Sequence, residues 1–153
     1  MNNTNNLTWQ WQKMTTLSAT EMHEILLERT KVFVVEQKCA YQEVDQWDQY
    51  SWHLIGRNQH HRLIAYARIT FPNTKYNLPS IGRVLVTKEF RHLGYSQLLI
   101  KNCLAKCQLE YPNQAIFLQA QSYLKKFYEK FGFKPISAIY DDEGIDHLDM
   151  KLG

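Results

Sequence analysis

The segment RHLGYS, residues 91–96, joins the apolar run IGRVLV (81–86) to the helical pattern SQLLIKNCLAKC (96–107) and is the most informative part of the sequence for the fold. A strand that ends in a tight turn and feeds directly into a helix leaves backbone N–H groups at the positive end of the helix dipole. Gly94 permits such a turn. The joint therefore predicts an anion-binding site.

The pattern of apolar residues predicts further strands and helices on both sides of this joint. A capping box of Ser18 and Glu21 predicts the start of the first helix, and Gly132 is placed to end the last one. The strand before the quoted turn, its helix and the next apolar strand predict a parallel β-α-β unit. The expected strands are 7–14, 51–57, 62–71, 80–86, 115–120, 134–140 and 145–152, and the expected helices start near 18, 96 and 123. This order predicts an α+β domain with one mixed sheet.

Length and composition limit the function classes. The chain has 153 residues, is 44% hydrophobic and carries a net charge of +3, which predicts one folded core and no nucleic-acid partner. The apolar runs are shorter than a membrane span, and the N-terminus lacks the features of a secretory signal, so we expect a cytoplasmic protein with no membrane partner. We expect residues 1–6 to be flexible and residues 7–153 to form the single domain.

The three cysteines predict neither a disulfide framework nor a metal site. Cys103 and Cys107 lie one helical turn apart, but no CxxC motif or histidine cluster completes a set of four ligands. The better interpretation is a pair of buried thiols on a helix face. We therefore expect no metal.

The residues at the quoted turn resemble a known family. Arg91, Gly94 and Ser96 after an apolar strand resemble the R/Q-x-x-G-x-G/A signature of the GNAT superfamily, the acetyl-coenzyme A-dependent N-acetyltransferases, although Ser96 stands where Gly or Ala is usual. The blocks that together resemble its ElaA-like branch are VFVVEQ (32–37), YARI (66–69), IGRVLV (81–86), FYEKFGF (127–133) and DEGIDHLDM (142–150). The resemblance implies a single GNAT-like domain with a mixed, mostly antiparallel sheet of about seven strands, a splayed parallel pair and about four helices.

The turn also suits coenzyme A on physical grounds. Backbone N–H groups from Leu93 to Ser96 form a nest for the pyrophosphate, and Arg91 adds a fixed charge. The resemblance implies that the pantetheine arm pairs with the edge of strand 84–86. Acetyl-coenzyme A is the expected cosubstrate. The expected binding residues are Val84, Leu85, Val86, Arg91, His92, Leu93, Gly94, Tyr95, Ser96 and Gln121, the last where many relatives have Asn.

Amide formation requires a neutral amine and a proton for the leaving thiolate. A lysine-like amine has a pKa of about 10.4, so only about one molecule in 2,500 is neutral near pH 7. The resemblance places Tyr128 as the general acid, whereas its residue type alone would also fit a core aromatic. The candidate bases are Glu36, Glu43, Asp45, Asp48, His53 and His147, of which Glu36 and His147 belong to the resembling blocks.

The acids and aromatic residues between positions 36 and 53 suggest contacts to a cationic amine. We expect Glu36, Asp45, Asp48 and His53 to line the substrate site, although each acid alone would also fit a solvated loop. We expect the acceptor to be a small amine or a peptide, and exposed sheet edges are compatible with a homodimer.

Two other functions stay open. Arg29, Phe33 and EVDQWD (43–48) also resemble the E-x-D-x-x-D region of acyl-homoserine-lactone synthases, which share the fold. A domain that binds acyl-coenzyme A without turnover, as a sensor or interaction module, is the alternative from a different class.

Overall fold

The computed structural model describes residues 6–153. The strands are β1 (Thr8–Lys13), β2 (Ser51–Arg57), β3 (Leu63–Thr70), β4 (Ser80–Val86), β5 (Ile116–Gln121), β6 (Lys134–Pro135), β7 (Tyr140–Asp142) and β8 (Ile145–Leu152). The α-helices are α1 (Ala19–Arg29), α2 (Tyr95–Glu110) and α3 (Lys125–Glu129). A π-helix, η1 (Thr30–Glu36), extends α1, and short 3-10 helices are η2 (Gln46–Tyr50), η3 (Lys88–Phe90) and η4 (Ser122–Leu124).

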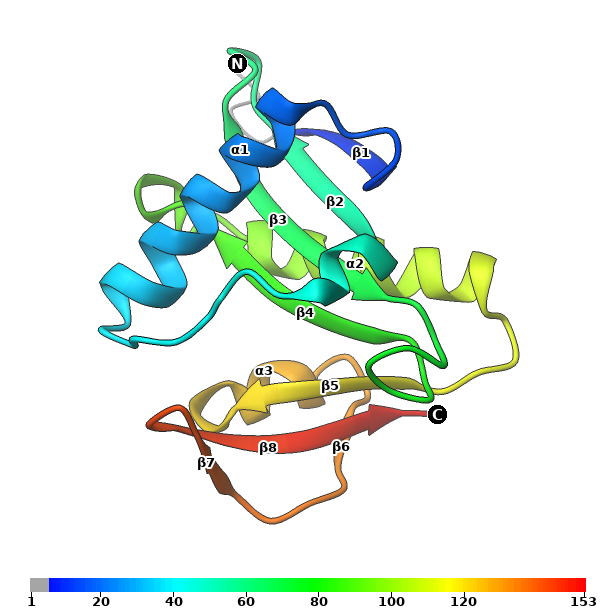
Figure 1. The fold of residues 1–153 in the computed structure, drawn as a ribbon. Helices are drawn as coiled ribbons and strands as arrows, with labels where there is room; N and C mark the ends of the chain where they lie inside the picture. Colours follow the sequence, from blue (N-terminus) through cyan, green and yellow to red (C-terminus); the bar gives the residue numbers. More distant parts are fainter. Residues whose placement is uncertain (1–5) are drawn as a thin grey trace.

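The strands form one mixed sheet in two halves (Figure 1). The order is β1-β2-β3-β4-β5-β8-β6, and β7 also pairs with β8. Neighbours within β1–β4 are antiparallel, as are β5 and β8. The parallel pair is β4 with β5, joined through α2, which confirms the predicted β-α-β unit. The sheet is mixed and mostly antiparallel, as expected.

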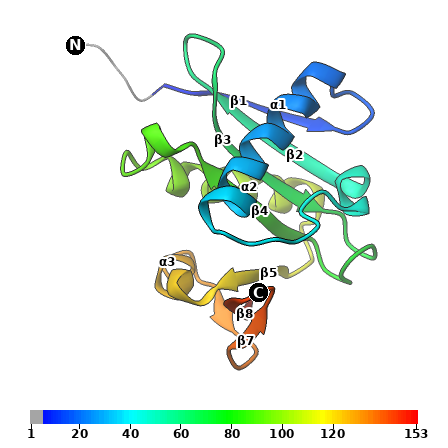
Figure 2. The ribbon, with the colours of Figure 1, turned by 60° about the vertical axis from the view of Figure 1, so that its left-hand side comes forward.

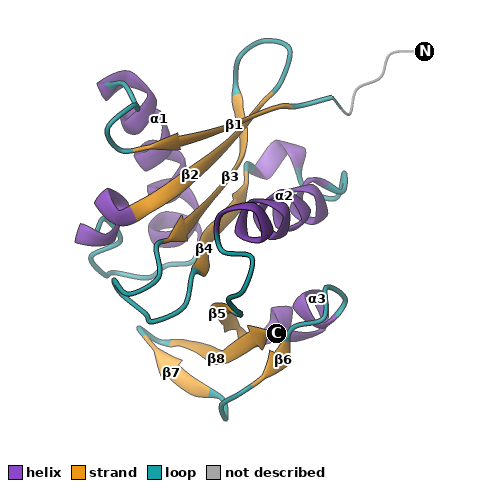
Figure 3. Cartoon of the chain, turned by 90° about the vertical axis from the view of Figure 1, so that its right-hand side faces the viewer, coloured by secondary structure: helices purple, strands orange, loops and turns teal. Residues whose placement is uncertain are grey.

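Helices cover both faces of the first half of the sheet. α1 crosses one face and α2 lies on the other (Figures 2 and 3). The alternation of a strand explains how one strand serves both layers. On β4, Leu85 packs in the cluster with Ile25 and Val32 of the α1 side, whereas Val86 packs in the cluster that contains Leu99 of α2.

The start of α1 follows the predicted local chemistry. The Ser18 hydroxyl accepts a hydrogen bond from the Glu21 N–H, and the Glu21 carboxylate accepts one from the Ser18 N–H, each at 3.0 Å. This reciprocal capping box satisfies two of the N–H groups that a helix start leaves without partners.

The C-terminal third differs from the prediction in its detail. The described chain has eight strands rather than about seven, because the expected strand 134–140 is divided into β6 and β7 around exposed residues that include Ile136 and Ile139. The described chain also has three α-helices rather than about four, and the last is short because residues 122–124 form a 3-10 turn. Gly132, at φ 93°, ends this segment in the left-handed conformation, as expected.

Several expectations concern the ends of the chain and metals. The predicted flexibility of residues 1–6 falls almost entirely on residues 1–5, which lie outside the described residues. Within residues 6–153, no helix is long and apolar enough to span a bilayer, and no group of three metal-ligating side chains is found. Cys103 and Cys107 are buried free thiols on α2.

Candidate active site

A cavity of about 490 Å³ lies where the two halves of the sheet separate. Among the described residues, β4 and β5 share one register pair, Ser80 with Phe117, although each strand continues beyond it. The edge of β4 toward β5 therefore keeps backbone groups without a strand partner. Residues of both strands line the cavity, including Val84, Leu85 and Gln121. An open strand edge beside a cavity can pair with an extended amide chain.

A bulge in β4 shapes this edge. Tyr66 pairs with Leu85 and Arg68 with Gly82, so three steps along β4 oppose two along β3. Arg83, within the bulge, has φ 52°, a left-handed conformation that non-glycine residues seldom adopt. Bulges of this kind redirect side chains and end pairing near functional sites. Here the bulge lies on the cavity wall.

The 91–96 turn lies at one end of the cavity. Gly94 caps α2 with φ 85°, and no side chain caps this helix start. The first hydrogen bond of the helix runs from the Leu98 N–H to the Gly94 carbonyl (3.4 Å), so the N–H groups before Leu98 open toward the turn. A Cβ added at Gly94 would meet no atom within 4 Å, so there is open space beside the turn. The geometry suits a pyrophosphate.

The other expected residues of the turn differ in exposure. His92, at φ 65°, and Leu93 and Ser96 are exposed, whereas Tyr95 is buried in the core under α2. Of these four, His92 and Ser96 line the cavity.

Arg91 is already engaged by the protein. Its Nε donates to the Val86 carbonyl (3.0 Å), and its two Nη atoms pair with Glu36 at 3.0 and 2.9 Å. Three of its five N–H groups are thereby used, which leaves two for a phosphate. This ion pair with two contacts joins the end of η1 to the turn, so two expected site residues that line the cavity contact each other.

Tyr128 lies at the cavity with its ring in the core. The residue is 6% exposed, packs against Phe127 and Phe133, and lines the cavity. Burial, with smaller contributions from Cys103 and Tyr123, raises the pKa of Tyr128 well above its usual value. Its hydroxyl has no hydrogen-bond partner within the described chain. The phenol therefore stays protonated at neutral pH with its proton available to a ligand.

His147 presents a nitrogen to the same cavity. Its Nδ1 lies 2.7 Å from the Ile145 carbonyl, and because a carbonyl only accepts, Nδ1 carries the proton. The other nitrogen, Nε2, then holds a lone pair in the neutral ring. Stacking on Tyr140, with ring centres 6.3 Å apart, fixes the imidazole plane. His147 thus has the tautomer of a general base.

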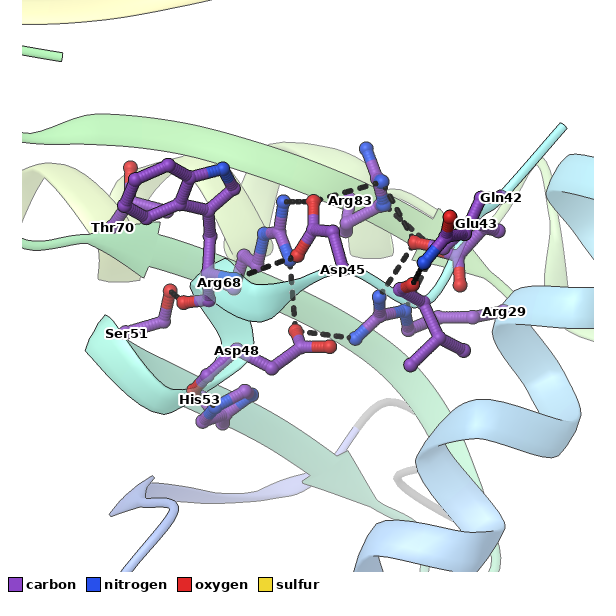
Figure 4. Close-up of polar contacts among 12 residues, drawn as sticks. Arg29, Gln42, Glu43, Asp45, Asp48, Ser51, His53, Arg68, Thr70 and Arg83 are labelled. Atoms are coloured by element: carbon purple, nitrogen blue, oxygen red, sulfur yellow. Dashed lines mark hydrogen bonds and ion pairs between the residues drawn. The ribbon is translucent and has the colours of Figure 1, made fainter. Parts of the chain in front are cut away.

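Two of the acids that the sequence offered for substrate contact, Asp45 and Asp48, belong to a buried network (Figure 4), whereas Glu36 lines the cavity. Within the described chain, Asp45, Asp48 and His53 do not line the cavity. A network of three carboxylates and three guanidinium groups holds these acids beneath η2. Its ion pairs are Arg29–Glu43 (2.8 Å), Arg29–Asp48 (2.7 Å), Arg68–Asp45 (2.7 Å), Arg68–Asp48 (2.8 Å), Arg83–Glu43 (2.6 Å) and Arg83–Asp45 (3.4 Å).

The network changes protonation throughout this region. Burial opposes ionisation of Asp45, yet hydrogen bonds and charges from Arg68 and Arg83 lower its pKa to about 2. Burial also lowers the pKa of His53, whose Nε2 donates to the Asp48 carbonyl (2.9 Å) while Nδ1 accepts from the Tyr66 hydroxyl (2.7 Å). His53 is therefore a buried neutral ring with both nitrogens used. It has no lone pair for a substrate.

Two contacts tie the segment after η1 to the other half of the sheet. Gln121 donates to the Gln37 side chain (3.2 Å), and the Cys39 thiol donates to the Glu143 carbonyl (3.2 Å). All four residues line the cavity. The segment that follows η1 therefore bridges the cavity from the β4 side to the β5 side.

Sequence reasoning missed part of the cavity wall. The cavity is also lined by Lys75 and Tyr76 of a polar loop, Gln119 on the exposed face of β5 and Asp142 at the end of β7. None carries a motif. The one available signal was the segment DEGIDHLDM (142–150), which contains both Asp142 and His147.

The chain matches known proteins over nearly its whole length. The family model described as an acetyltransferase (GNAT) domain matches residues 15–153. A UPF0039 protein of Synechocystis is 45% identical over 144 residues, with 94% of each chain covered. Crystal structures of an acyl-CoA N-acyltransferase from Pseudomonas aeruginosa (TM-score 0.92, 31% identity) and of Escherichia coli ElaA (TM-score 0.90, 33% identity) each cover 97% of this chain and 100% of their own.

These matches show the family. The chain belongs to the GNAT acetyltransferases, in the branch that contains ElaA. The acyl-homoserine-lactone synthase BjaI, in a structure with SAM and isopentyl-CoA, has a TM-score of 0.72 at 14% identity and covers 95% of this chain and 82% of its own. That likeness concerns the fold alone.

Proposed function

We propose that this chain transfers an acetyl group from acetyl-coenzyme A to a primary amine by direct attack. The observation that carries the proposal is the placement of Tyr128 and His147 on one cavity that reaches the 91–96 turn. Tyr128 lies on α3 and His147 on β8, so both belong to the half of the structure that contains β5. The cosubstrate lies between them, with its pyrophosphate on the N–H groups from Leu93 to Ser96 and its pantetheine arm along Val84–Val86.

His147 and Tyr128 each carry out one of the two proton transfers in this proposal. The amine attacks the thioester carbonyl in its neutral form, and as the C–N bond forms its nitrogen gives up a proton to Nε2 of His147. As the C–S bond breaks, the leaving sulfur receives the Tyr128 hydroxyl proton. Water in the cavity returns a proton to the tyrosinate from the imidazolium, so the products are an amide and a free thiol. General acid and base groups of this kind each contribute about 10²–10⁴ in rate.

Glu36 has a different role in this proposal. Its carboxylate is bound at both oxygens by Arg91, so it is poorly suited to accept a proton from the amine. We assign Glu36 to positioning Arg91 at the turn. His147 is the proposed base because its Nε2 has no hydrogen-bond partner among the described residues.

A thermal-shift and thiol-release pair tests the proposal. We expect acetyl-coenzyme A to raise the melting temperature and to release free thiol when primary amines are added. Stabilisation without thiol release for any amine would support the acyl-coenzyme A sensor instead. Turnover of long acyl thioesters but not of acetyl-coenzyme A would support the synthase-like alternative. No stabilisation by any of these thioesters would contradict the site itself.

A further inference from the structure

The cavity end remote from the 91–96 turn carries a cation without an ion-pair partner. Lys75 lies on the loop 71–79, which precedes β4, whereas the turn follows it; the seven residues of β4 separate the two by about 20 Å. Lys75 is half-buried and lines the cavity. Within the described chain its ammonium has no carboxylate within 4.0 Å, and Nζ lies 5.3 Å from the Tyr76 ring centre.

The neighbouring charges do not neutralise Lys75. The nearby guanidinium groups of Arg68 and Arg83 are matched by the acids of the buried network, three cations against three anions. Burial first, and then Arg68 and Arg83, lower the pKa of Lys75, whereas Asp45 and Asp142 raise it by less. A half-buried ammonium without a partner is unfavourable in the free protein, and a ligand anion would relieve that cost.

The opposite wall carries an acid that is also without an ion-pair partner. Asp142 is the last residue of β7, is half-buried and lines the cavity. No cation lies within 4.0 Å of its carboxylate among residues 6–153. Asp142 pairs in register with Ile145, and Tyr140 pairs with His147, so the acid and the proposed base share one hairpin.

A chain of side-chain hydrogen bonds holds these walls in a fixed relation. The Tyr76 hydroxyl donates to Gln119 Oε1 (2.9 Å), and Gln119 Nε2 donates to the Tyr140 hydroxyl (2.8 Å). Tyr140 in turn donates to Asp149 (2.6 Å). The loop of Lys75, the strand β5 and the hairpin of Asp142 are therefore connected across the split, which favours a ligand of defined charge spacing.

We infer that the acceptor is a zwitterion, an amine that also carries a carboxylate, with the carboxylate bound by Lys75 and the amine held between Asp142 and His147. The inference rests on the proposed acetyltransfer and narrows its substrate class. Opposite charges on the two walls orient such a molecule with its nitrogen toward the base. A diamine would instead place a second ammonium beside Lys75 and Arg83, where like charges repel.

Three matched acceptor panels test the inference: the standard α-amino acids with two β-amino acids, the corresponding α-amides, and linear diamines of similar length. Thiol release from acetyl-coenzyme A gives kcat and KM for each. We expect the best amino acid to exceed its own amide at least tenfold in kcat/KM. The difference is expected mainly in KM, because the carboxylate contact is made before the chemical step.

Substitutions at Lys75 test whether this residue causes the preference for amino acids over their amides. Lys75→Met should reduce kcat/KM for the amino acid about tenfold and leave the amide within twofold, whereas Lys75→Arg should keep the preference. Lys101→Met, on an exposed position of α2 outside the cavity, removes the same charge and should change neither substrate. Asp142→Asn should weaken both the amino acid and the amide, because both carry the amine.

The possible outcomes distinguish a failure of the zwitterion inference from a failure of the proposed acetyltransfer. Amides or diamines that match the amino acids, or a Lys75→Met variant that affects acid and amide equally, would overturn the zwitterion and leave acetyltransfer intact. Thiol release with no member of the three panels would overturn the proposed acetyltransfer, and the zwitterion inference with it.

Discussion

Two charged regions adjoin each other, because Arg68 and Arg83 of the buried network also line the cavity, and the regions differ in how their charges are matched. In the buried network of Arg29, Glu43, Asp45, Asp48, Arg68 and Arg83, every group has a partner of opposite sign within 3.4 Å. On the cavity wall, Lys75, Asp142 and Nε2 of His147 have no such partner within the described chain. Matched charges fix the loop that covers the sheet, and unmatched charges are available to a substrate.

The largest expected effect comes from breaking the matched region. Arg29→Met should lower the free energy of unfolding by about 3–5 kcal/mol, because Glu43 and Asp48 would each lose one of two cationic partners and the network would keep a buried negative charge in excess. Each of these acids already has one buried oxygen without a hydrogen bond. Urea unfolding at neutral pH measures the change.

The matched control for Arg29→Met is a substitution in an exposed ion pair. Arg62→Met removes a guanidinium paired with Glu89, where the side chains are 48% and 65% exposed, and should lower stability far less than Arg29→Met does. Equal losses for Arg29→Met and Arg62→Met would show that burial does not distinguish the network.

The next effect concerns the chemistry at the cavity. Tyr128→Phe should lower kcat about 10²-fold while the thermal shift with acetyl-coenzyme A stays near that of the wild type, because only the proton donor is lost. The phenyl ring of this variant would keep the packing against Phe127 and Phe133. An unchanged kcat would remove Tyr128 from the reaction.

Acid should weaken the network in two steps. His53 is neutral when folded because burial lowers its pKa, so the unfolded chain binds an extra proton and stability falls as pH drops below about 6.5. Asp45, with a pKa of about 2 when folded, contributes stability above its unfolded value that is lost as pH falls from about 4 toward 2, roughly 2 kcal/mol in total.

Urea unfolding at pH 7.5, 5.5 and 3.0 follows both steps. His53→Gln should flatten the change between pH 7.5 and 5.5 and leave the lower step in place. Constant stability from pH 7.5 to 3.0 would contradict the assigned charges.

Substitution of Arg91 at the 91–96 turn should have a smaller effect than substitution of Tyr128 in the cavity. Arg91→Ala should weaken acetyl-coenzyme A binding about tenfold, with a loss that shrinks as salt rises, because two of its N–H groups remain for phosphate. Calorimetric titration at two salt concentrations measures it. Unchanged affinity would assign phosphate binding to the backbone alone.

The smallest expected effect is an increase in the affinity for acetyl-coenzyme A. Glu36→Gln removes a negative charge that neutralises Arg91, and we expect binding of acetyl-coenzyme A to tighten about twofold to threefold at low salt. Calorimetry under the same conditions as for Arg91→Ala provides the comparison. Weaker binding would show that the Glu36–Arg91 pair is needed to shape the turn.

The fold was predictable where local chemistry and periodicity agree. The capping box of Ser18, the αL residue Gly132 and the strand-turn-helix joint at Gly94 each depend on neighbours in sequence. The division of residues 134–140 was not predictable, because an apolar run containing a proline fits one strand or two short ones.

The candidate site was predictable only for residues that carry a motif. Which cation faces which acid depends on the tertiary fold, so Asp45 and Asp48 were expected at the substrate, whereas arginines hold them in the interior. One available signal was overlooked. Arg29, Arg68 and Arg83 lie within apolar patterns, and a buried guanidinium requires an acid.

A crystal structure of the protein with acetyl-coenzyme A tests the central claim most directly. We expect the pyrophosphate on the N–H groups of residues 93–96, the pantetheine arm along the β4 edge, and the thioester sulfur within hydrogen-bond reach of the Tyr128 hydroxyl. Density for the thioester outside the split between β4 and β5, or a sulfur remote from that hydroxyl, would contradict it.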